Sequence, residues 1–383
     1  MNIYGFSFSL IELIVFGALL ITFFYQLYFY TRYLNGVLRL RRKAKNGKVH
    51  FQTEQPPVSV IICAKDEAEN LEKFLPLILQ QDYPEYEVIV INDGSTDDTE
   101  KILRDLGEQY PRLRTTFVPV GAKNVSTKKL GITLGIKASK YDFLLMTDAD
   151  CVPENKEWIA CMMRNFSRET DFVLGYGAYQ QKKGFLNRLI TFDTLFIALQ
   201  YLGMAAARKP YMGVGRNLAY RKETFMAQKG FASTLHLSSG DDDLLVNKAS
   251  NPWNTRIEVA SDSITWSEPN KTFRGWFYQK ERHLSVSSFY KSSSKMRLVF
   301  EPTTRGLFYL LLILALVFGS MITQIAAGVL FLTRYLVQAI IINMSSRHFG
   351  GRRYISSLPL LDILLPLINL YILLFGRKST NRW

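Results

Sequence analysis

The chain has 383 residues, of which 48% are hydrophobic, and its 47 Lys and Arg against 33 Asp and Glu give a net charge of +14. The positive charges concentrate beside apolar stretches, which favours a membrane surface over nucleic acid as the partner. The three cysteines, Cys63, Cys151 and Cys161, lack metal-binding spacing and are expected to be reduced thiols of a cytosolic domain.

An apolar segment near the N-terminus is long enough to cross a bilayer. Leu10 to Tyr30 is nearly all apolar over about 20 residues. No Lys or Arg precedes it and no small-residue cleavage site follows, so we expect a transmembrane helix within residues 1–33 and not a removable signal peptide. The basic residues that follow are Arg32, Arg39, Arg41, Arg42, Lys43, Lys45 and Lys48. By the positive-inside rule, the N-terminus is expected outside and residues 34–55 form a basic linker on the cytosolic side.

Strand-like and helix-like segments alternate from Val58 to about residue 290. The strand-like runs are Val58–Ala64, Glu87–Asn92, Thr115–Val120 and Phe143–Thr147. Segments with helical spacing of apolar residues lie between them, at Ala68–Gln81, Asp97–Tyr110 and Thr127–Ser139. This alternation predicts an α/β fold with a mostly parallel sheet and helices on both faces, in a domain that we place at residues 56–300.

Polar residues follow these strands directly. Ligands of such sheets bind outside the carboxyl ends of the strands, where Ala64-Lys-Asp-Glu67, Asn92-Asp-Gly-Ser-Thr-Asp97 and Thr147-Asp-Ala-Asp150 lie. Asp148 and Asp150 are one residue apart on an extended chain, so their carboxylates can point the same way. They repel each other unless a cation lies between them, and Mg²⁺ or Mn²⁺ shared with phosphate oxygens is the predicted ion. A solvated turn is the alternative for this motif alone.

Two segments further along have alternative interpretations. Phe185–Ala207 is apolar but interrupted by charged and polar residues, so it is expected to be either an interfacial helix or a buried helix of the domain. Gly213 and Gly215 allow close backbone approach to a sugar or phosphate, with Arg216 and Asn217 as polar contacts. An ordinary turn is the default interpretation of this short motif.

Three adjacent carboxylates, Asp241, Asp242 and Asp243, precede a helix expected to begin at Leu244. Like charges held together raise the pKa of one member, which suits a general base. The residues alone leave open which of the three is the base, and stabilisation of the helix N-terminus is a second role for the cluster. Gln279 and Arg282 are three residues apart, so on a helix they share a face.

The chain is expected to return to the membrane in residues 301–383, after Pro302. Leu307–Ile322 and Ile325–Ile342 approach spanning length, although one long helix through Leu332 followed by a shorter one fits almost as well. The last apolar segment, Leu358–Phe375, contains prolines and an aspartate and has basic residues on both flanks. We therefore expect about two crossing helices and a final re-entrant or interfacial segment.

In this order, the motifs resemble the membrane-embedded branch of the family-2 glycosyltransferases, which includes hyaluronan, chitin and cellulose synthases and their single-transfer relatives. The resemblance covers about residues 58–290. The motifs are Val58-Ser-Val-Ile-Ile-Cys-Ala-Lys-Asp-Glu67, Val90-Ile-Asn-Asp-Gly-Ser-Thr-Asp97, Lys128-Lys129 followed by Gly131, Thr147-Asp-Ala-Asp150, Gly213-Val-Gly-Arg-Asn217, Gly240-Asp-Asp-Asp243 and Gln279-Lys-Glu-Arg-His283.

The resemblance implies a GT-A fold, a nucleotide-sugar donor, usually a UDP-sugar, and Mg²⁺ or Mn²⁺. By position, the residues implied to bind the nucleotide sugar are Ala64, Glu67, Asp93, Lys128, Asp148, Gln279 and Arg282, with Asp93 accepting the uracil imide proton. Asp150 is implied to bind the metal, with Asp148 beside it, and Asp242 to be the catalytic base.

The expected acceptor contacts are Gly215, Arg216, Asn217, His283 and Trp276. Polymer-forming relatives usually have Trp at the position of His283, and an imidazole offers less stacking area. This departure favours single or limited transfer, although Trp276 or Tyr278 could supply the missing ring.

The leading hypothesis is a metal-dependent, membrane-bound inverting glycosyltransferase. It passes a sugar from a nucleotide-sugar donor to a lipid-linked or saccharide acceptor at the cytosolic membrane face. The alternatives are a processive polysaccharide synthase and a non-catalytic membrane scaffold that binds a nucleotide sugar. Expected partners are the sugar donor, the acceptor and membrane lipids, with no nucleic acid, and a homo-oligomer is left open.

Overall fold

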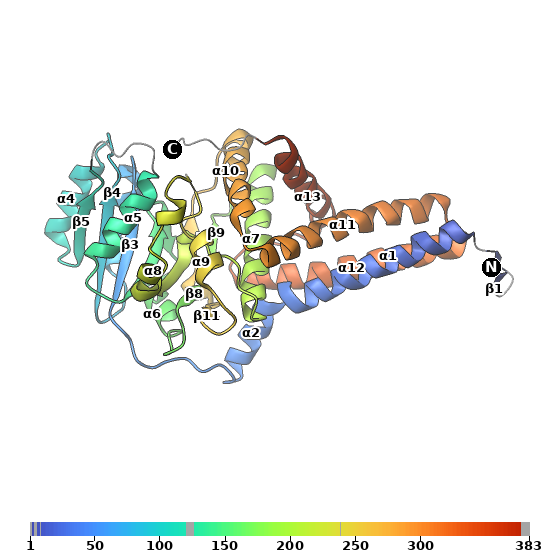
Figure 1. Ribbon diagram of the computed structural model, residues 1–383, viewed down its shortest axis with the longest axis horizontal. Helices are drawn as coiled ribbons and strands as arrows, with labels where there is room; N and C mark the ends of the chain where they lie inside the picture. The colour runs from blue at the N-terminus through green and yellow to red at the C-terminus, as the bar shows by residue number, and fades with distance from the viewer. Residues whose placement is uncertain (1, 4–5, 8, 120–125, 238, 377–383) are drawn as a thin grey trace.

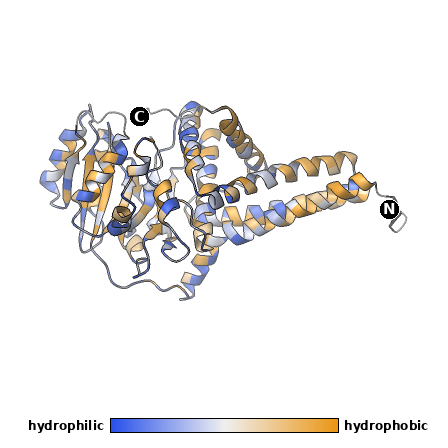
Figure 2. Ribbon diagram, in the orientation of Figure 1, coloured by the Kyte–Doolittle hydropathy of each residue, from blue (hydrophilic) through white to orange (hydrophobic). Residues whose placement is uncertain are grey.

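The computed structural model describes residues 2–3, 6–7, 9–119, 126–237 and 239–376. An α/β domain carries a rod of three long helices, which projects away from the domain (Figure 1). Hydrophobic residues run along the rod, whereas hydrophilic residues are frequent on the helices that surround the sheet (Figure 2). The rod therefore has the hydropathy of a membrane-embedded region, and the α/β domain has that of a water-exposed one.

The larger sheet has seven strands in the order β11-β8-β10-β6-β3-β4-β5. The strands are β3 (Val58–Ala64), β4 (Tyr86–Asn92), β5 (Leu113–Phe117), β6 (Phe143–Asp148), β8 (Phe172–Leu174), β10 (Leu218–Arg221) and β11 (Thr255–Ile257). β3 is parallel to β4 and β6, whereas β10 is antiparallel to its two neighbours. The predicted strands and the mostly parallel order are confirmed; Val120, the expected end of one strand, lies outside the described residues.

The central strands are buried on both faces because successive side chains point to opposite sides. In β3, Val60 and Ile62 enter one apolar core and Ile61 enters the other. The first core lies under α3 (Ala68–Leu79), α4 (Thr99–Gln109) and α6 (Trp158–Met163). The second lies under α5 (Thr127–Ala138), α7 (Phe185–Ala206), α8 (Lys222–Ala227) and α9 (Asp243–Ala249). Helices thus cover both faces, as the sequence predicts.

A smaller sheet of three strands continues from the end of β6. Its order is β7 (Cys151–Pro153), β12 (Thr265–Ser267) and β9 (Gly177–Tyr179). The loop after β12 leads into α10 (Phe273–Val286), whose N-terminus is capped by the side chain of Thr272. This sheet and α10 form a wall beside the carboxyl ends of the larger sheet.

The rod consists of α1 (Leu10–Phe29), α11 (Ser292–Phe318) and α12 (Met321–His348), with α2 (Gly36–Lys45) at its base and the short β1 (Asn2–Ile3) and β2 (Phe6–Ser7) at its tip (Figure 1). Two expectations need correction. α11 begins at Ser292, so it runs through Pro302 and across the expected domain boundary at residue 300. α11 and α12 separate at Gly319–Ser320, which excludes one long helix through Leu332.

Five helices in the described part of the chain are long and apolar enough to cross a membrane, which makes this a membrane protein. They include α7, but α7 is buried over 83% of its most apolar window, between the domain and the rod. The alternative of a buried helix is therefore correct for this segment. α13 (Leu358–Phe375) lies across the base of the rod and beside α10, not along the rod (Figure 1). Its interfacial or re-entrant character stays a prediction.

A close approach of backbones joins the N-terminal segment to α7. A Cβ atom added at Gly203 would overlap the main-chain carbonyl of Tyr33, which lies in the π-helical turn Tyr30–Leu34 after α1. Gly36, at the start of α2, faces the backbone of Gly203 in the same way. Only glycine fits a contact of this kind, so this joint holds the rod close to the domain.

We expect Gly203→Ala to destabilise the protein by about 1–3 kcal/mol, because the added methyl group forces the two backbones apart. The thermal unfolding midpoint in detergent should fall accordingly. Gly328→Ala is the matched control, since a Cβ there meets nothing within 4 Å. Equal midpoints for the two variants would contradict the close approach.

Candidate active site

The carboxyl ends of three parallel strands meet at one edge of the larger sheet. Cys63 lies opposite Asp148, and Ala64 lies opposite Asn92. The chain segments that leave these strands therefore start side by side. Ser126 caps α5 next to this edge by accepting from the N–H of Lys129, which brings Lys128 over the strand ends.

Lys128 joins two acidic motifs that are distant in the sequence. Its Nζ lies 3.0 Å from Oδ1 of Asp148 and 3.5 Å from Oδ2 of Asp241. Burial opposes the charge on Lys128, but the two carboxylates raise its pKa well above the ordinary value, so the ammonium stays charged. In return, although burial acts to raise the pKa of Asp241, Lys128 lowers it.

Asp242 lies in the same pocket, but its pKa is shifted in the opposite direction to that of Asp241. The pocket is lined by residues that include Lys128, Asp148, Gly215, Asp241 and Asp242. Burial and the neighbouring charge of Asp241 raise the pKa of Asp242 to about 6. Its carboxylate accepts from the N–H groups of Gly215 and Asp243, which fix its orientation. A carboxylate with a pKa near the working pH, open to a pocket, can accept a proton from a ligand.

Asp243 was expected as a third candidate base, and the structure corrects this. The Asp243 side chain is buried and accepts from the hydroxyl of Tyr290 at 2.6 Å and from the N–H of Leu244 at 2.8 Å. Burial and Asp242 raise the pKa of Asp243 to about 8. Because both of its oxygens are engaged inside the protein, Asp243 holds the start of α9 and does not face the pocket.

Asp148 and Asp150 offer ligand atoms that suit a divalent cation. One atom each from Asp148, Asp150 and Cys151 lie within 4.8 Å of one another. Burial and the charge of Asp148 raise the pKa of Asp150, so a cation between them would relieve their repulsion. Burial also raises the pKa of Cys151, whose thiol contacts Ser267 at 2.9 Å. A neutral thiol is a poor ligand for Mg²⁺ or Mn²⁺, so the fit rests on the two carboxylates.

A wide cleft of about 530 Å³ opens beside Asp150. It is lined by Asp150, Tyr179, Glu268, Pro269, Asn270, Lys271, Thr272 and Gln279. Gln279 was predicted here, and it donates to the Tyr179 hydroxyl at 2.9 Å and accepts from Asn270 at 2.9 Å. Tyr179 and the loop at residues 268–272 were missed, because they come from the small sheet and no motif marks them.

The residues expected at the nucleotide lie at the same edge. Asp93 is buried and accepts from the Thr127 hydroxyl at 2.6 Å. Its N–H donates to the carbonyl of Ala64 at 2.8 Å, which ties β3 to the loop after β4. Burial raises the pKa of Glu67, and the charges of Asp150 and Asp148 add to this effect. Glu67 therefore lies close enough to Asp148 and Asp150 for their charges to affect its pKa.

Two expected acceptor contacts are wrong. Asn217 is fully buried: its amide donates to the carbonyls of Tyr176 and Ser263, and its oxygen accepts from Trp158. Trp276 is 3% exposed and packs in the core, so it offers no face to a sugar.

The other expected acceptor contacts, Gly215, Arg216 and His283, lie nearer the cleft beside Asp150 than Asn217 and Trp276 do. Arg216 stacks on the ring of Tyr179 at 4.3 Å, and Gly215 contacts Asp242. His283 is exposed on α10. Arg282, on the same helix, contributes to the low pKa of Asp241, so its guanidinium lies near the pocket.

Comparisons with known proteins agree with this arrangement. Residues 59–227 match the family model described as Glycosyl transferase family 2. The chain is 25% identical over 238 residues to the protein named probable glycosyltransferase YdaM of Bacillus subtilis, which covers 60% of this chain and 54% of that protein. It is 24% identical over 238 residues to a poly-beta-1,6-N-acetyl-D-glucosamine synthase of Staphylococcus epidermidis, which covers 61% of this chain and 54% of the relative. The chain thus matches about half the length of each relative.

Among solved structures, the mannosyltransferase PcManGT from Pyrobaculum calidifontis, in complex with GDP-Man and Mn²⁺, has a TM-score of 0.55 at 16% identity. The match covers 94% of this chain and 99% of that chain. This likeness shows the fold, which is the GT-A fold.

The acidic pair generates the first prediction about the site. Asp150→Asn should weaken binding of Mn²⁺ in the presence of UDP by about 10-fold or more, because the loss of even an outer-shell partner has an effect of that size. Electron paramagnetic resonance of free Mn²⁺ measures the change. Glu108→Gln, at an exposed position on α4, is the control and should bind as the unmodified protein does. Undiminished binding by Asp150→Asn would contradict the site.

Proposed function

We propose that the protein, whose residues 59–227 match the family-2 glycosyltransferase model, is a membrane-bound inverting glycosyltransferase. It would move a sugar from a nucleotide-sugar donor, a UDP-sugar in our proposal, to a lipid-linked or saccharide acceptor at the cytosolic membrane face. The observation that carries this proposal is the single pocket lined by Lys128, Asp148 and Asp242. In this pocket, an ammonium group that suits a diphosphate lies beside a carboxylate that can accept a proton.

The chemistry divides among residues of this chain. Asp242 takes the proton of the acceptor hydroxyl as its oxygen attacks the anomeric carbon. The bond from that carbon to the diphosphate oxygen breaks, and one displacement inverts the configuration. Lys128 and Arg282 neutralise the charge that develops on the departing diphosphate. A divalent cation held by Asp150 and Asp148 would supply further charge neutralisation there.

Binding of the sugar donor would use both parts of the site. Asp93, held by Thr127, keeps a carboxylate oxygen for the nucleotide base. Glu67, whose pKa responds to the charges of Asp150 and Asp148, is the second proposed contact of the nucleotide. Gln279 and the loop at residues 268–272 line the open cleft on the other side of Asp150. This cleft is the proposed entry for the acceptor, with His283 and Arg216 nearby.

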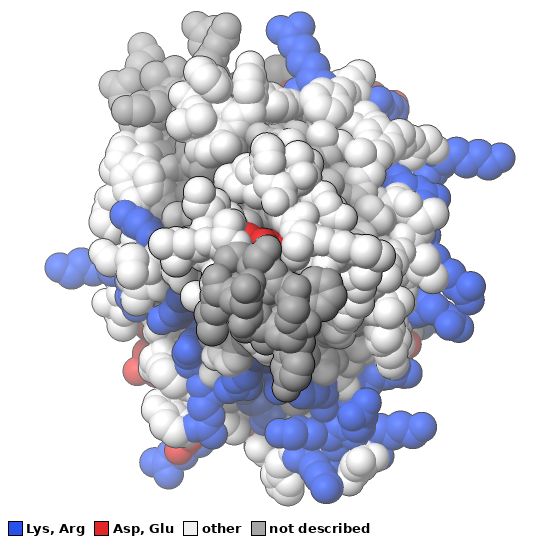
Figure 3. Space-filling view, turned by 90° about the vertical axis from the view of Figure 1, so that its right-hand side faces the viewer, with Lys and Arg blue, Asp and Glu red and all other residues white. Residues whose placement is uncertain are grey.

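The proposed orientation in the membrane rests on the distribution of basic residues. Viewed along the rod from its tip, the surface is largely free of Lys and Arg in the centre, and these side chains project around the rim (Figure 3). The basic residues after α1 lie on and around α2, at the base of the rod (Figure 1). By the positive-inside rule, we place the domain in the cytosol and the rod tip outside.

A second candidate function is processive synthesis of a polysaccharide. The printed name of the Staphylococcus epidermidis relative supports it, because that protein is a polymer synthase by name. The exposed imidazole of His283, in place of a flat indole, favours single or limited transfer. The mass of the product distinguishes the two functions.

A screen of nucleotide sugars tests the proposal. We expect release of the nucleoside diphosphate from one class of sugar donor when membrane extract supplies the acceptor. Chelation of divalent cations should reduce this release to background, and added Mn²⁺ should restore it. Release that persists in excess chelator would remove the metal from the proposal, and the absence of release from every UDP- and GDP-sugar would contradict the function.

Asp242→Asn should lower kcat by about 10²–10⁴-fold, the usual contribution of a general base, with little effect on binding of the sugar donor. Asp243→Asn is the matched control, because Asp243 is held by Tyr290 inside the protein and should retain most of the activity. Similar losses in both variants would contradict the assignment of the base.

The pKa of Asp242, about 6, predicts the pH dependence of kcat/KM. The base acts only when ionised, so kcat/KM should rise as the pH increases through about 6 and reach a plateau above it. Rate measurements from about pH 5 to about pH 8 test this. A profile that is flat across this range would show that another group accepts the proton.

A further inference from the structure

A buried ion pair holds the helix that carries Gln279 and Arg282. Lys280 lies between these two residues in α10, but its side chain points the other way, toward α7. Its Nζ donates to both carboxylate oxygens of Asp193, at 2.8 and 2.7 Å. The side chains of Lys280 and Asp193 are 6% and 10% exposed. The pair therefore joins α10 to α7 in the interior, away from water.

The geometry of this pair restricts how α10 can move. Separating a buried ammonium from the carboxylate that it contacts through both oxygens leaves an uncompensated charge, so the pair opposes displacement of the helix. Because Gln279 and Arg282 flank Lys280 on the same helical segment, any shift of α10 changes their distance from Asp150 and Asp241. Gln279 also depends on its contact with Tyr179, at 2.9 Å, to face the cleft. Small displacements of groups that orient a substrate are costly for catalysis.

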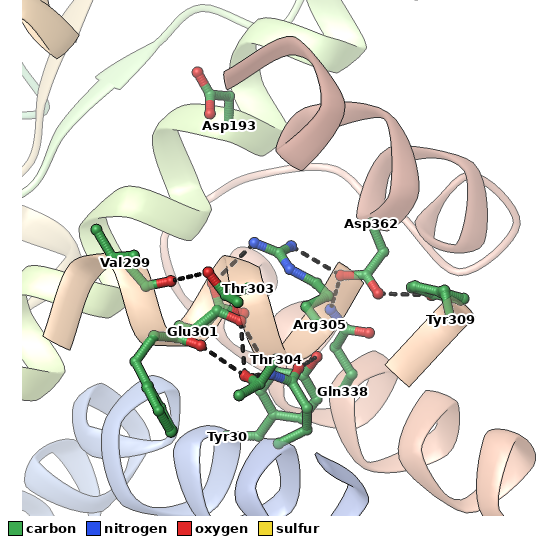
Figure 4. Close-up of polar contacts among 12 residues, drawn as sticks. Tyr30, Asp193, Val299, Glu301, Thr303, Thr304, Arg305, Tyr309, Gln338 and Asp362 are labelled. Carbon is green, nitrogen blue, oxygen red and sulfur yellow. Dashed lines mark hydrogen bonds and ion pairs between the residues drawn. The ribbon is translucent and has the colours of Figure 1, made fainter. Parts of the chain in front are cut away.

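The helix at the other end of the pair is attached to the membrane helices. The guanidinium of Arg305 in α11 lies 4.8 Å over the ring of Phe196 in α7. Arg188, also in α7, donates to Ser357 just before α13. Asp193 itself lies on α7 apart from the polar network of the rod, with its carboxylate directed away from that network (Figure 4). α7 therefore contacts the rod through one set of residues and α10 through another.

The network beside α7 is built to resist displacement. Asp362 of α13 accepts from Arg305 at 3.0 Å and from Arg334 at 2.8 Å, and it also accepts from Tyr309 and Gln338 (Figure 4). Buried charges that are paired within a membrane segment are expensive to separate. This network joins α11, α12 and α13, and α7 packs against it, so α7 is a firm support for α10.

We propose that Asp193 is a positioning residue for glycosyl transfer, which acts through Lys280 to set the place of Gln279 and Arg282 in the active site. This inference rests on the proposed function. The membrane helices would thereby fix the side of the site that meets the diphosphate and the acceptor. In this proposal neither Asp193 nor Lys280 touches the substrate. Their removal should therefore change the ratio of donor hydrolysis to sugar transfer, and it should not change the role of Asp242 as the base.

The experiment compares the full-length protein in detergent with Asp193→Asn and with the double variant Asp193→Leu/Lys280→Met. The measurements are kcat, KM for the sugar donor, the ratio of its hydrolysis to transfer, and the unfolding midpoint. For Asp193→Asn we expect kcat/KM to fall about 10- to 100-fold and the hydrolysis ratio to rise, because α10 is no longer held in place. Lys280→Arg, which keeps the charge, should stay close to the unmodified protein.

Glu258→Gln is the matched control. Glu258 is 1% exposed and accepts from Arg164 at 2.9 Å, so its ion pair, whose arginine is partly exposed, joins the end of β11 to the end of α6 and does not involve α10. This variant should lower the unfolding midpoint without changing kcat/KM of the folded protein. The double variant replaces a buried ion pair with apolar side chains, which commonly preserves stability. It should regain the midpoint without regaining kcat/KM, because apolar packing does not fix the register of α10.

Two results would overturn the inference while leaving the proposed function intact. One is an Asp193→Asn protein whose kcat/KM and hydrolysis ratio equal those of Glu258→Gln. The other is a double variant that regains both the midpoint and kcat/KM. If the unmodified protein transfers no sugar, the proposed function fails first and the inference falls with it.

Discussion

The site depends on one ammonium group placed between two carboxylates. Lys128 contacts Asp148 at the end of β6 and Asp241 in the turn before α9. Without this cation, two acidic motifs would face each other across a pocket, and each would raise the pKa of the other. With it, the pKa of Asp241 is lowered, whereas burial and the charge of Asp241 raise the pKa of the adjacent Asp242. The charge of Lys128 thus helps to separate the pKa values of these two adjacent aspartates.

The fold supports this arrangement from two sides. The register of β3, β4 and β6 brings Ala64, Asn92 and Asp148 to one edge, and α5 delivers Lys128 above it. On the opposite side, α10 closes the cleft, with its position set by α7 and by the small sheet. Since α7 packs against the charged network of the rod, the membrane region is part of the scaffold of the site. An apolar anchor alone would not require buried Arg and Asp side chains in these helices.

Local sequence patterns predicted the elements well, because short buried strands and amphipathic helices are determined mainly by neighbouring residues. The bounds of β3 agree with prediction to the residue, and those of α3, α4 and α5 agree within two residues at each end. The sequence also predicted that the motifs after the strands lie close together, because the carboxyl ends of parallel strands lie at one edge of the sheet. The predicted end of α11, at Ile322, differs from its observed end at Phe318. Phe318 and Met321 are both apolar, so hydropathy alone does not mark the turn at Gly319–Ser320.

Properties that depend on distant partners were not predictable. Asn217 is polar and follows two glycines, yet Trp158, Tyr176 and Ser263 enclose it. Trp276 and Lys280 lie on the inner side of α10, where α7 supplies Asp193 as the partner of Lys280. The choice among the three adjacent aspartates required Tyr290, which removes Asp243 from the pocket.

The most direct measurement is a structure of the full-length protein with bound Mn²⁺ and a non-hydrolysable nucleotide sugar, with the metal located by anomalous scattering. The account predicts a manganese peak at the carboxylates of Asp148 and Asp150, with Lys128 at the diphosphate and the Asp242 carboxylate facing the anomeric carbon. A metal and nucleotide bound elsewhere, with no ligand in the pocket lined by Lys128, Asp148 and Asp242, would contradict it.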